Sequence, residues 1–68
     1  MDFGSRLYEL MKEHNITQSQ LAKNIDVSQR AVSLWVNHQS EPTESSIVKC
    51  ARYFSVTADY ILGLTDDY

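Results

Sequence analysis

The strongest constraint on the fold of this chain is a short pattern that occurs three times. In each copy an apolar residue precedes a hydroxyl residue, and a second apolar residue follows the hydroxyl four positions later. The copies are Ile16-Thr17-Leu21, Val27-Ser28-Val32 and Val56-Thr57-Ile61. Such a hydroxyl accepts a hydrogen bond from a backbone N–H in a first helical turn, and the flanking apolar side chains close over it as a hydrophobic staple. The pattern therefore predicts a helix start at each copy.

The first two starts lie eleven residues apart, which leaves room for one short helix and a turn of about three residues. Gln20 stands three positions after Thr17, so these two residues can form a capping box. Asp26 falls where the turn requires a positive φ, which Asp adopts at a cost that Gly does not incur. Residues 16–37 are thus predicted to form a helix-turn-helix unit.

Three further helices are predicted around this unit. Asp2 can cap a first helix that ends near His14 and Asn15, and Thr43 can cap a fourth helix after Pro42. Gly63 ends a short fifth helix. We expect a compact, all-α, five-helix domain over residues 1–64, with residues 65–68 as an acidic tail or the start of a linker.

Spacing also assigns side chains to faces. The apolar residues of the first helix that recur at helical spacing are Phe3, Leu7, Leu10 and Met11. The charged residues expected on its solvated face are Arg6, Glu9, Lys12 and Glu13. Leu64 is expected to pack back onto the domain after the fifth helix.

Size and composition exclude several classes of protein. Sixty-eight residues form one small core, and no apolar run approaches the roughly 18 residues of a membrane span. With no signal-peptide pattern, we expect a soluble, cytoplasmic protein. Cys50 is the single cysteine, which excludes an internal disulfide and suits a core position. His14 and His38 lie far apart, and no nucleophile–base pair or glycine loop occurs, so we expect no metal, cofactor, small-molecule ligand or enzymatic activity.

Net charge is −3, whereas a nucleic-acid-binding protein usually carries a basic surface. The charges are unevenly distributed, however. Residues 17–40 hold Lys23 and Arg30 against Asp26 alone, so the acidic excess lies elsewhere in the chain. Because a Debye length is about 8 Å at physiological salt, local charge counts for more than the total. We interpret the excess acid as lowering non-specific affinity.

The run ITQSQLAKNIDVSQRAVSLWVNHQSEPTESSIVKCARYFSVTADYILGL resembles the Cro and phage-repressor-type helix-turn-helix family, also called XRE-like. The resemblance is carried by the ITQSQLA opening, the VSxxxVSxWxN segment, the proline before the fourth helix and the VTADYILGL ending. It implies a five-helix domain that binds double-stranded operator DNA, usually as a homodimer, with the third helix in the major groove.

The resemblance also implies roles for individual residues. The implied base contacts are Gln29, Arg30, Ser33 and Leu34. The implied phosphate contacts are Gln18, Ser28, Asn37, His38, Gln39 and Ser40. Gln can pair with adenine and Arg with guanine, whereas Leu can only contact a thymine methyl. Each position also has a structural explanation, such as a cap at Ser28 or a solvated cation at Arg30.

Two departures from the family pattern affect these expectations. Members often pair an Arg in the first helix with a Glu near the end of the third, where this chain has Met11 and Val36. Because apolar groups can replace a buried ion pair together, we predict that these two side chains touch. His38 stands where Gly is common, which alters the loop, and a protonated His38 could bind phosphate with an affinity that falls as pH rises through about 6.5.

Two classes of function remain open. The first is a sequence-specific transcriptional regulator, with a repressor favoured, whose two subunits read half-sites one duplex turn apart. The second is a protein-binding module on the same scaffold, such as an antirepressor or an antitoxin-like regulator. Dimerisation is expected with DNA as the ligand, and Tyr53 and Tyr60 are interface candidates because aromatic residues are enriched at interfaces.

Overall fold

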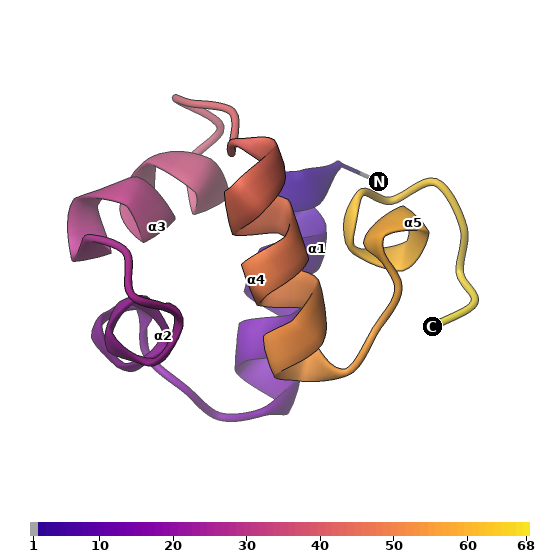
Figure 1. The fold of residues 1–68 in the computed structure, drawn as a ribbon, viewed down its shortest axis with the longest axis horizontal. Helices are drawn as coiled ribbons and strands as arrows, with labels where there is room; N and C mark the ends of the chain where they lie inside the picture. Colours follow the sequence, from indigo (N-terminus) through magenta and orange to yellow (C-terminus); the bar gives the residue numbers. More distant parts are fainter. Residues whose placement is uncertain (1) are drawn as a thin grey trace.

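The repeated caps predict helix starts that the structure confirms. The computed structural model describes residues 2–68, and in this range the chain forms helices and no strand. The helices are α1 (Phe3–Glu13), α2 (Gln18–Ile25), α3 (Gln29–Val36), α4 (Glu44–Phe54) and α5 (Ala58–Ile61). Figure 1 shows α4 crossing in front of α1, with α2 and α3 on one side and α5 on the other. This arrangement is the predicted all-α, five-helix domain.

Every one of these helices begins with a side-chain cap. The cap oxygen accepts the N–H three residues later, at 2.9–3.1 Å, from Asp2, Thr17, Ser28, Thr43 and Thr57. At α2 the capping box is complete, because the Thr17 N–H also donates to Gln20 Oε1 at 2.8 Å. The second apolar residue of each staple is fully buried: Leu21, Val32 and Ile61. The first apolar residue of each staple packs half-buried against the same core.

The helices end in a second repeated device, a residue in the left-handed conformation. These residues are Asn15, Asp26, His38 and Ser55, with φ of 55–60°, and Gly63, with φ of 79°. After each left-handed residue, the N–H of the following residue donates a hydrogen bond to the carbonyl five positions before it, at 2.8–3.0 Å, as in a Schellman motif. The predicted positive φ at Asp26 is confirmed.

Three connections share one design, which we call the three-residue connector: a left-handed residue, a staple residue and an N-cap. The connectors are Asn15-Ile16-Thr17, Asp26-Val27-Ser28 and Ser55-Val56-Thr57. Between α3 and α4 the chain instead runs through a longer polar loop over residues 38–42. The tight turn therefore fixes α3 relative to α2.

Buried residues from α1, α2, α3, α4 and α5 form the core, and α1 approaches α3 very closely. A Cβ added at Gly4 would overlap the Trp35 carbonyl oxygen, so only glycine fits there. The rings of Phe3 and Trp35 meet edge to face with centroids 5.8 Å apart. Cys50 is a core residue, as predicted, and burial raises the pKa of its thiol to about 12.

The predicted solvated position of Arg6 is wrong. Arg6 is 4% exposed, and its guanidinium lies 4.0 Å from the centroid of the Tyr60 ring. Its Nη2 lies 3.2 Å from Asp66 Oδ1. The aromatic face and the carboxylate offset the cost of removing the cation from water. Polar interaction with Tyr60, followed by that with Asp66, raises the pKa of Arg6 above its usual range. The Tyr68 ring also contacts the Tyr60 ring, with centroids 5.1 Å apart, so residues 65–68 lie against α1 and α5.

Two further packing predictions have different outcomes. The prediction that Leu64 packs back is wrong: its N–H bonds to the Asp59 carbonyl, while its side chain is 72% exposed. Gly63, directly before it, is left-handed, with φ of 79°. Val36 packs against the core cluster that includes Met11, and a direct contact between these two side chains stays a prediction. In residues 2–68 no helix is long and apolar enough to cross a membrane.

Candidate nucleic-acid interface

The two faces of α3 differ in exposure. Val32 and Trp35 are buried in the core, whereas Gln29 and Arg30 are exposed at the first turn of the helix. Ser33 and Leu34 are half-buried, one turn further along. The four residues predicted to contact bases therefore form one edge of α3 that the core does not use.

Hydrogen bonds occupy both ends of α3. At its start, Ser28 Oγ accepts the Ala31 N–H at 3.0 Å, so Ser28 is a cap, and the residue is exposed. At its end, Asn37 Nδ2 donates to the Ser33 carbonyl at 2.9 Å and lies 3.4 Å from Ser33 Oγ. The structure thus brings together Ser33, a predicted base contact, and Asn37, a predicted phosphate contact.

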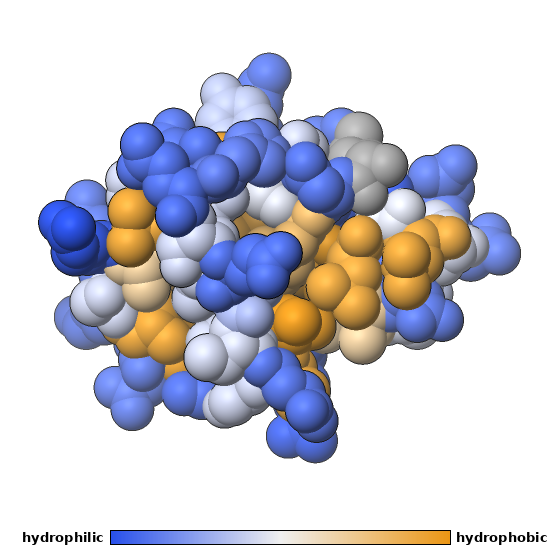
Figure 2. Space-filling model, turned by 90° about the horizontal axis from the view of Figure 1, so that it is seen from above, coloured by the Kyte–Doolittle hydropathy of each residue, from blue (hydrophilic) through white to orange (hydrophobic). Residues whose placement is uncertain are grey.

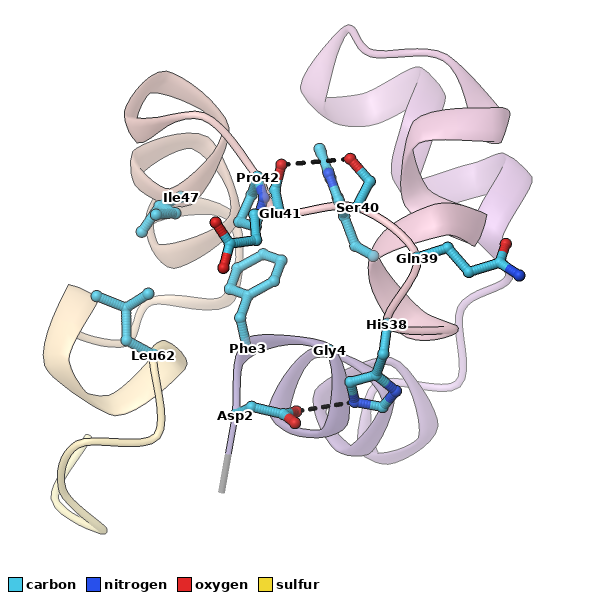
Figure 3. A pocket seen from close by; sticks show the side chains of 11 residues that line it. Asp2, Phe3, Gly4, His38, Gln39, Ser40, Glu41, Pro42, Ile47 and Leu62 are labelled. Carbon is cyan, nitrogen blue, oxygen red and sulfur yellow. Dashed lines mark hydrogen bonds and ion pairs between the residues drawn. The ribbon is translucent and has the colours of Figure 1, made fainter.

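The remaining predicted phosphate contacts lie on two segments. Gln18 is half-buried as the first residue of α2, where backbone N–H groups are directed outward. Gln39 and Ser40 are exposed in the loop after α3, and Gln39 points away from the other loop side chains in Figure 3. His38 turns toward α1 instead, where its Nε2 lies 3.0 Å from Asp2 Oδ1 (Figure 3).

The helix-turn-helix unit carries few cations. Lys23 and Arg30 are exposed on α2 and α3. Arg6 cannot contribute, because Tyr60 and Asp66 already hold its guanidinium. Neutral side chains and backbone N–H groups must therefore supply most polar contacts to any anionic ligand.

A groove of about 710 Å³ lies beside the end of α3. It is bounded by the start of α1, the loop over residues 38–42, α4 and the end of α5, and its apolar lining includes Phe3, Trp35, Pro42, Ile47 and Leu62. Figure 2 shows apolar side chains gathered on the side of the molecule where α5 lies. In residues 2–68 no group of His, Cys, Asp and Glu side chains is arranged to hold a metal ion.

Comparison with known families agrees with this geometry. A helix-turn-helix family model matches residues 7–61, which include all of α2, the turn and α3. The chain belongs to the helix-turn-helix family. The match begins within α1 and ends at the last residue of α5, so the family pattern includes most of the core, with Phe3 before its start.

Relatives of this helix-turn-helix chain are named as regulators of transcription. It is 39% identical over 65 residues to the HTH-type transcriptional regulator YobD of Bacillus subtilis (strain 168), covering 96% of this chain and 58% of YobD. It is 37% identical over 63 residues to the HTH-type transcriptional activator BcrR of Enterococcus faecalis, covering 93% of this chain and 31% of BcrR. The chain thus spans less than two thirds of either relative.

Solved structures give the same result for the fold. The P22 c2 repressor in complex with a synthetic operator superposes with a TM-score of 0.85 at 27% identity, covering 91% of this chain and 94% of the repressor chain in that structure. A transcriptional regulator from Listeria innocua superposes with a TM-score of 0.87 at 25% identity, covering 98% of this chain and 63% of that protein. The predicted resemblance to the Cro and phage-repressor type is confirmed.

Sequence reasoning missed two features near α3. The first is the contact between His38 and Asp2, residues 36 positions apart that no local pattern connects. The second is Gly4, whose missing Cβ lets α1 reach the end of α3. A signal for Gly4 did exist, because glycine is unfavourable within a helix and its presence there indicates a close approach.

Proposed function

We propose that this helix-turn-helix domain binds double-stranded operator DNA and regulates transcription, with α3 lying in the major groove. The observation that carries the proposal is the exposed edge of α3, where Gln29 and Arg30 extend from a helix whose opposite face is fixed in the core. Direct readout of base edges needs such a rigid helix with free polar side chains at its first turn. The operator complex of the P22 c2 repressor supports this proposal.

Individual roles follow from chemistry and position. Arg30 reads guanine and Gln29 reads adenine, and each good bidentate pair discriminates between bases by about 1–3 kcal/mol. Leu34 contacts a thymine methyl beside them, and Ser33 contacts a base edge. The phosphate-binding residues that fix register are Gln18, Ser28, Asn37, Gln39 and Ser40. His38 is not assigned a phosphate, because its imidazole is directed to Asp2.

Salt dependence is a direct measure of how many cations contact phosphate. Because Arg30 is assigned to a base, Lys23 is the cation of α2 and α3 that remains for phosphate, and log affinity should fall with log salt at a slope of about −1 for each subunit. A shallow slope combined with sequence preference is the expected signature of an acidic protein that relies on hydrogen bonds. The net charge of −3 is consistent with weak non-specific binding.

Selection from randomised duplexes tests the proposal. The wild-type chain should enrich one palindromic sequence, and Arg30→Ala should lose discrimination at one position in each half-site. Arg52→Ala is the matched control, because Arg52 is also exposed but lies in the last turn of α4. Enrichment of no sequence would refute the proposal and favour the protein-binding module, whose apolar contacts would come from exposed residues such as Leu64 and Val48.

We propose a homodimer as the DNA-binding form, because one short helix reads few base pairs and a palindrome requires two-fold symmetry. Tyr60 contributes nothing to such an interface, since it is buried beneath Arg6 and Tyr68. Tyr53 is 37% exposed and its hydroxyl accepts a hydrogen bond from Asn24 Nδ2 at 3.1 Å, so it remains a candidate. Sedimentation that shows one 7.8 kDa subunit bound per full palindromic duplex, at micromolar protein, would contradict the dimer.

A further inference from the structure

One carboxylate oxygen joins the beginning of α1 to the end of α3. Asp2 Oδ1 accepts the Ser5 N–H at 2.9 Å as the cap of α1, and it also lies 3.0 Å from His38 Nε2. The same ring nitrogen lies 3.2 Å from Ser5 Oγ. In Figure 3 the imidazole points across Gly4 toward Asp2 and not toward the solvent side, where Gln39 lies.

Backbone geometry directs the imidazole to this position. His38 is left-handed, with φ of 60°, where the chain turns sharply away from the α3 axis. A Cβ at Gly4 would lie 3.2 Å from the His38 ring and would overlap the Trp35 carbonyl oxygen. The absence of that atom lets the ring lie close to α1. The His38–Asp2 contact therefore depends on a glycine that also permits the close approach of α1 and α3.

The charges around His38 are acidic. Asp2 contacts the ring directly, and Glu41 lines the same groove from the loop. From α4 and α5 this groove is lined by Ile47 and Leu62, which carry no charge. The Ser5 backbone N–H, followed by the His38 side chain, lowers the pKa of Asp2 to about 2, so Asp2 is ionised at every pH near neutrality. A protonated imidazole thus faces a permanent carboxylate.

We propose that Asp2 is a positioning residue of the DNA-binding face. Acting through His38, it holds the end of α3 and the start of the loop over residues 38–42 against α1, and it does so more strongly when His38 is protonated. Gln39 and Ser40 follow His38 directly, so the position of these two phosphate-binding residues depends on the link. The effect on DNA rests on the proposed function, whereas the link itself does not.

This proposal differs from a direct contact between His38 and phosphate. In the direct case, DNA affinity depends on pH through His38 alone, and Asp2 is irrelevant apart from its cap. In the positioning case, removing the charge of Asp2 abolishes the same pH dependence. The two cases are distinguished by a variant that keeps the cap and loses the charge.

A double-mutant cycle measures the link without DNA. Asp2→Asn retains a good N-cap, and His38→Asn retains a residue that tolerates the left-handed conformation. Urea unfolding of the wild type, both single variants and the double variant should give a coupling of about two- to fivefold in the folding equilibrium at pH 6, the range of an exposed ion pair. The coupling should be smaller at pH 8. A coupling of zero at both pH values would overturn the proposal.

His14→Gln is the matched control for this cycle. His14 is the other histidine of the chain, but its Nδ1 bonds to the Leu10 carbonyl and its ring contacts Phe54. The coupling between Asp2 and His38 should be unchanged in the His14→Gln background. A coupling that disappears with His14 would assign the pH dependence to the wrong histidine and would overturn the proposal.

DNA affinity then tests the consequence, with the duplex selected by the wild-type chain as the probe. Asp2→Asn and His38→Asn should each lower affinity about two- to fivefold at pH 6, flatten the pH profile between 6 and 8, and combine without further loss. If His38→Asn flattens the profile and Asp2→Asn does not, His38 contacts phosphate directly and the positioning role is refuted. If no duplex binds although the coupling is present, the link stands and the proposed function fails.

Discussion

Replacing Ser55 with glycine should stabilise the domain, because Ser55 ends α4 in a conformation that suits glycine. Its φ is 58° and its ψ is 42°, and its N–H bonds to the Arg52 carbonyl, an interaction that glycine retains. The side chain is exposed, so its removal opens no cavity. Unlike Asn15 and Asp26 at the equivalent positions, a serine is not a residue type that adopts left-handed backbone readily.

The magnitude follows from two opposing effects. The left-handed conformation costs a residue with a Cβ about 1–2 kcal/mol. Glycine avoids this cost. Because glycine has more conformational freedom in the unfolded chain, however, folding costs it about 0.5–1 kcal/mol more entropy than a residue with a Cβ. The net gain should be about 0.5–1 kcal/mol, which for a domain of this size corresponds to a rise in Tm of about 2–8 °C. Asp26→Gly should gain less, because Asp tolerates this conformation better.

Thermal unfolding and urea unfolding of purified variants measure the gain. Ser55→Ala is the control, since it removes the hydroxyl and keeps the Cβ that causes the strain. The reasoning requires Ser55→Gly to be more stable than both the wild type and Ser55→Ala. If alanine stabilises as much as glycine, the effect comes from losing the hydroxyl, and the argument from backbone conformation is refuted.

Three other perturbations follow from the structure. Gly4→Ala should destabilise by about 1–3 kcal/mol in urea, although alanine normally favours a helix, because the new Cβ overlaps the Trp35 carbonyl oxygen. The Cys50 thiol should react with a thiol reagent only as fast as the domain unfolds, since burial raises its pKa to about 12; rapid labelling under native conditions would contradict this. The pKa of Asp2 is lowered from its ordinary value of 3.8 to about 2, so its ionised form should stabilise the folded state at pH values above 3.8, and this stability should be lost as pH falls through about 2. In urea unfolding, Asp2→Asn should therefore be less stable than the wild type at pH 5 and equally stable at the lowest pH.

Local chemistry determines most of this fold, which explains why helix starts could be predicted from sequence. A cap and a staple involve residues within five positions of one another, so their spacing is visible in the chain. The left-handed ends at Asn15 and Asp26 were also predictable, because these residue types adopt that conformation. His38 has the same tendency, and it is also left-handed, with φ of 60°.

Arg6 shows how residue type can mislead. It lies three positions after Phe3 and four before Leu10, which is the spacing of the buried face, yet its charge favours a surface assignment. Burial becomes tolerable because Tyr60 and Asp66, more than fifty residues away in sequence, meet the guanidinium. Partners so distant follow from tertiary structure and not from helical periodicity.

The edge of α3 was predictable for the same reason as the helix starts. Val32 and Trp35 face inward by helical spacing, and this leaves Gln29 and Arg30 exposed. The link between Asp2 and His38 was not predictable, since it requires a left-handed residue and a glycine to coincide at one corner. The exposed edge of α3 therefore follows from local helical spacing, whereas the contact that holds the end of α3 follows from tertiary structure.

Val27 belongs to two helices at once. Its N–H closes the last turn of α2 on the Ala22 carbonyl, and its side chain is the first member of the staple that begins α3. No flexible linker separates α2 from α3, so the last turn of α2 cannot unfold without also disrupting the first turn of α3. Amide protons of both helices should consequently exchange with solvent at one shared opening free energy, as a single cooperative unit.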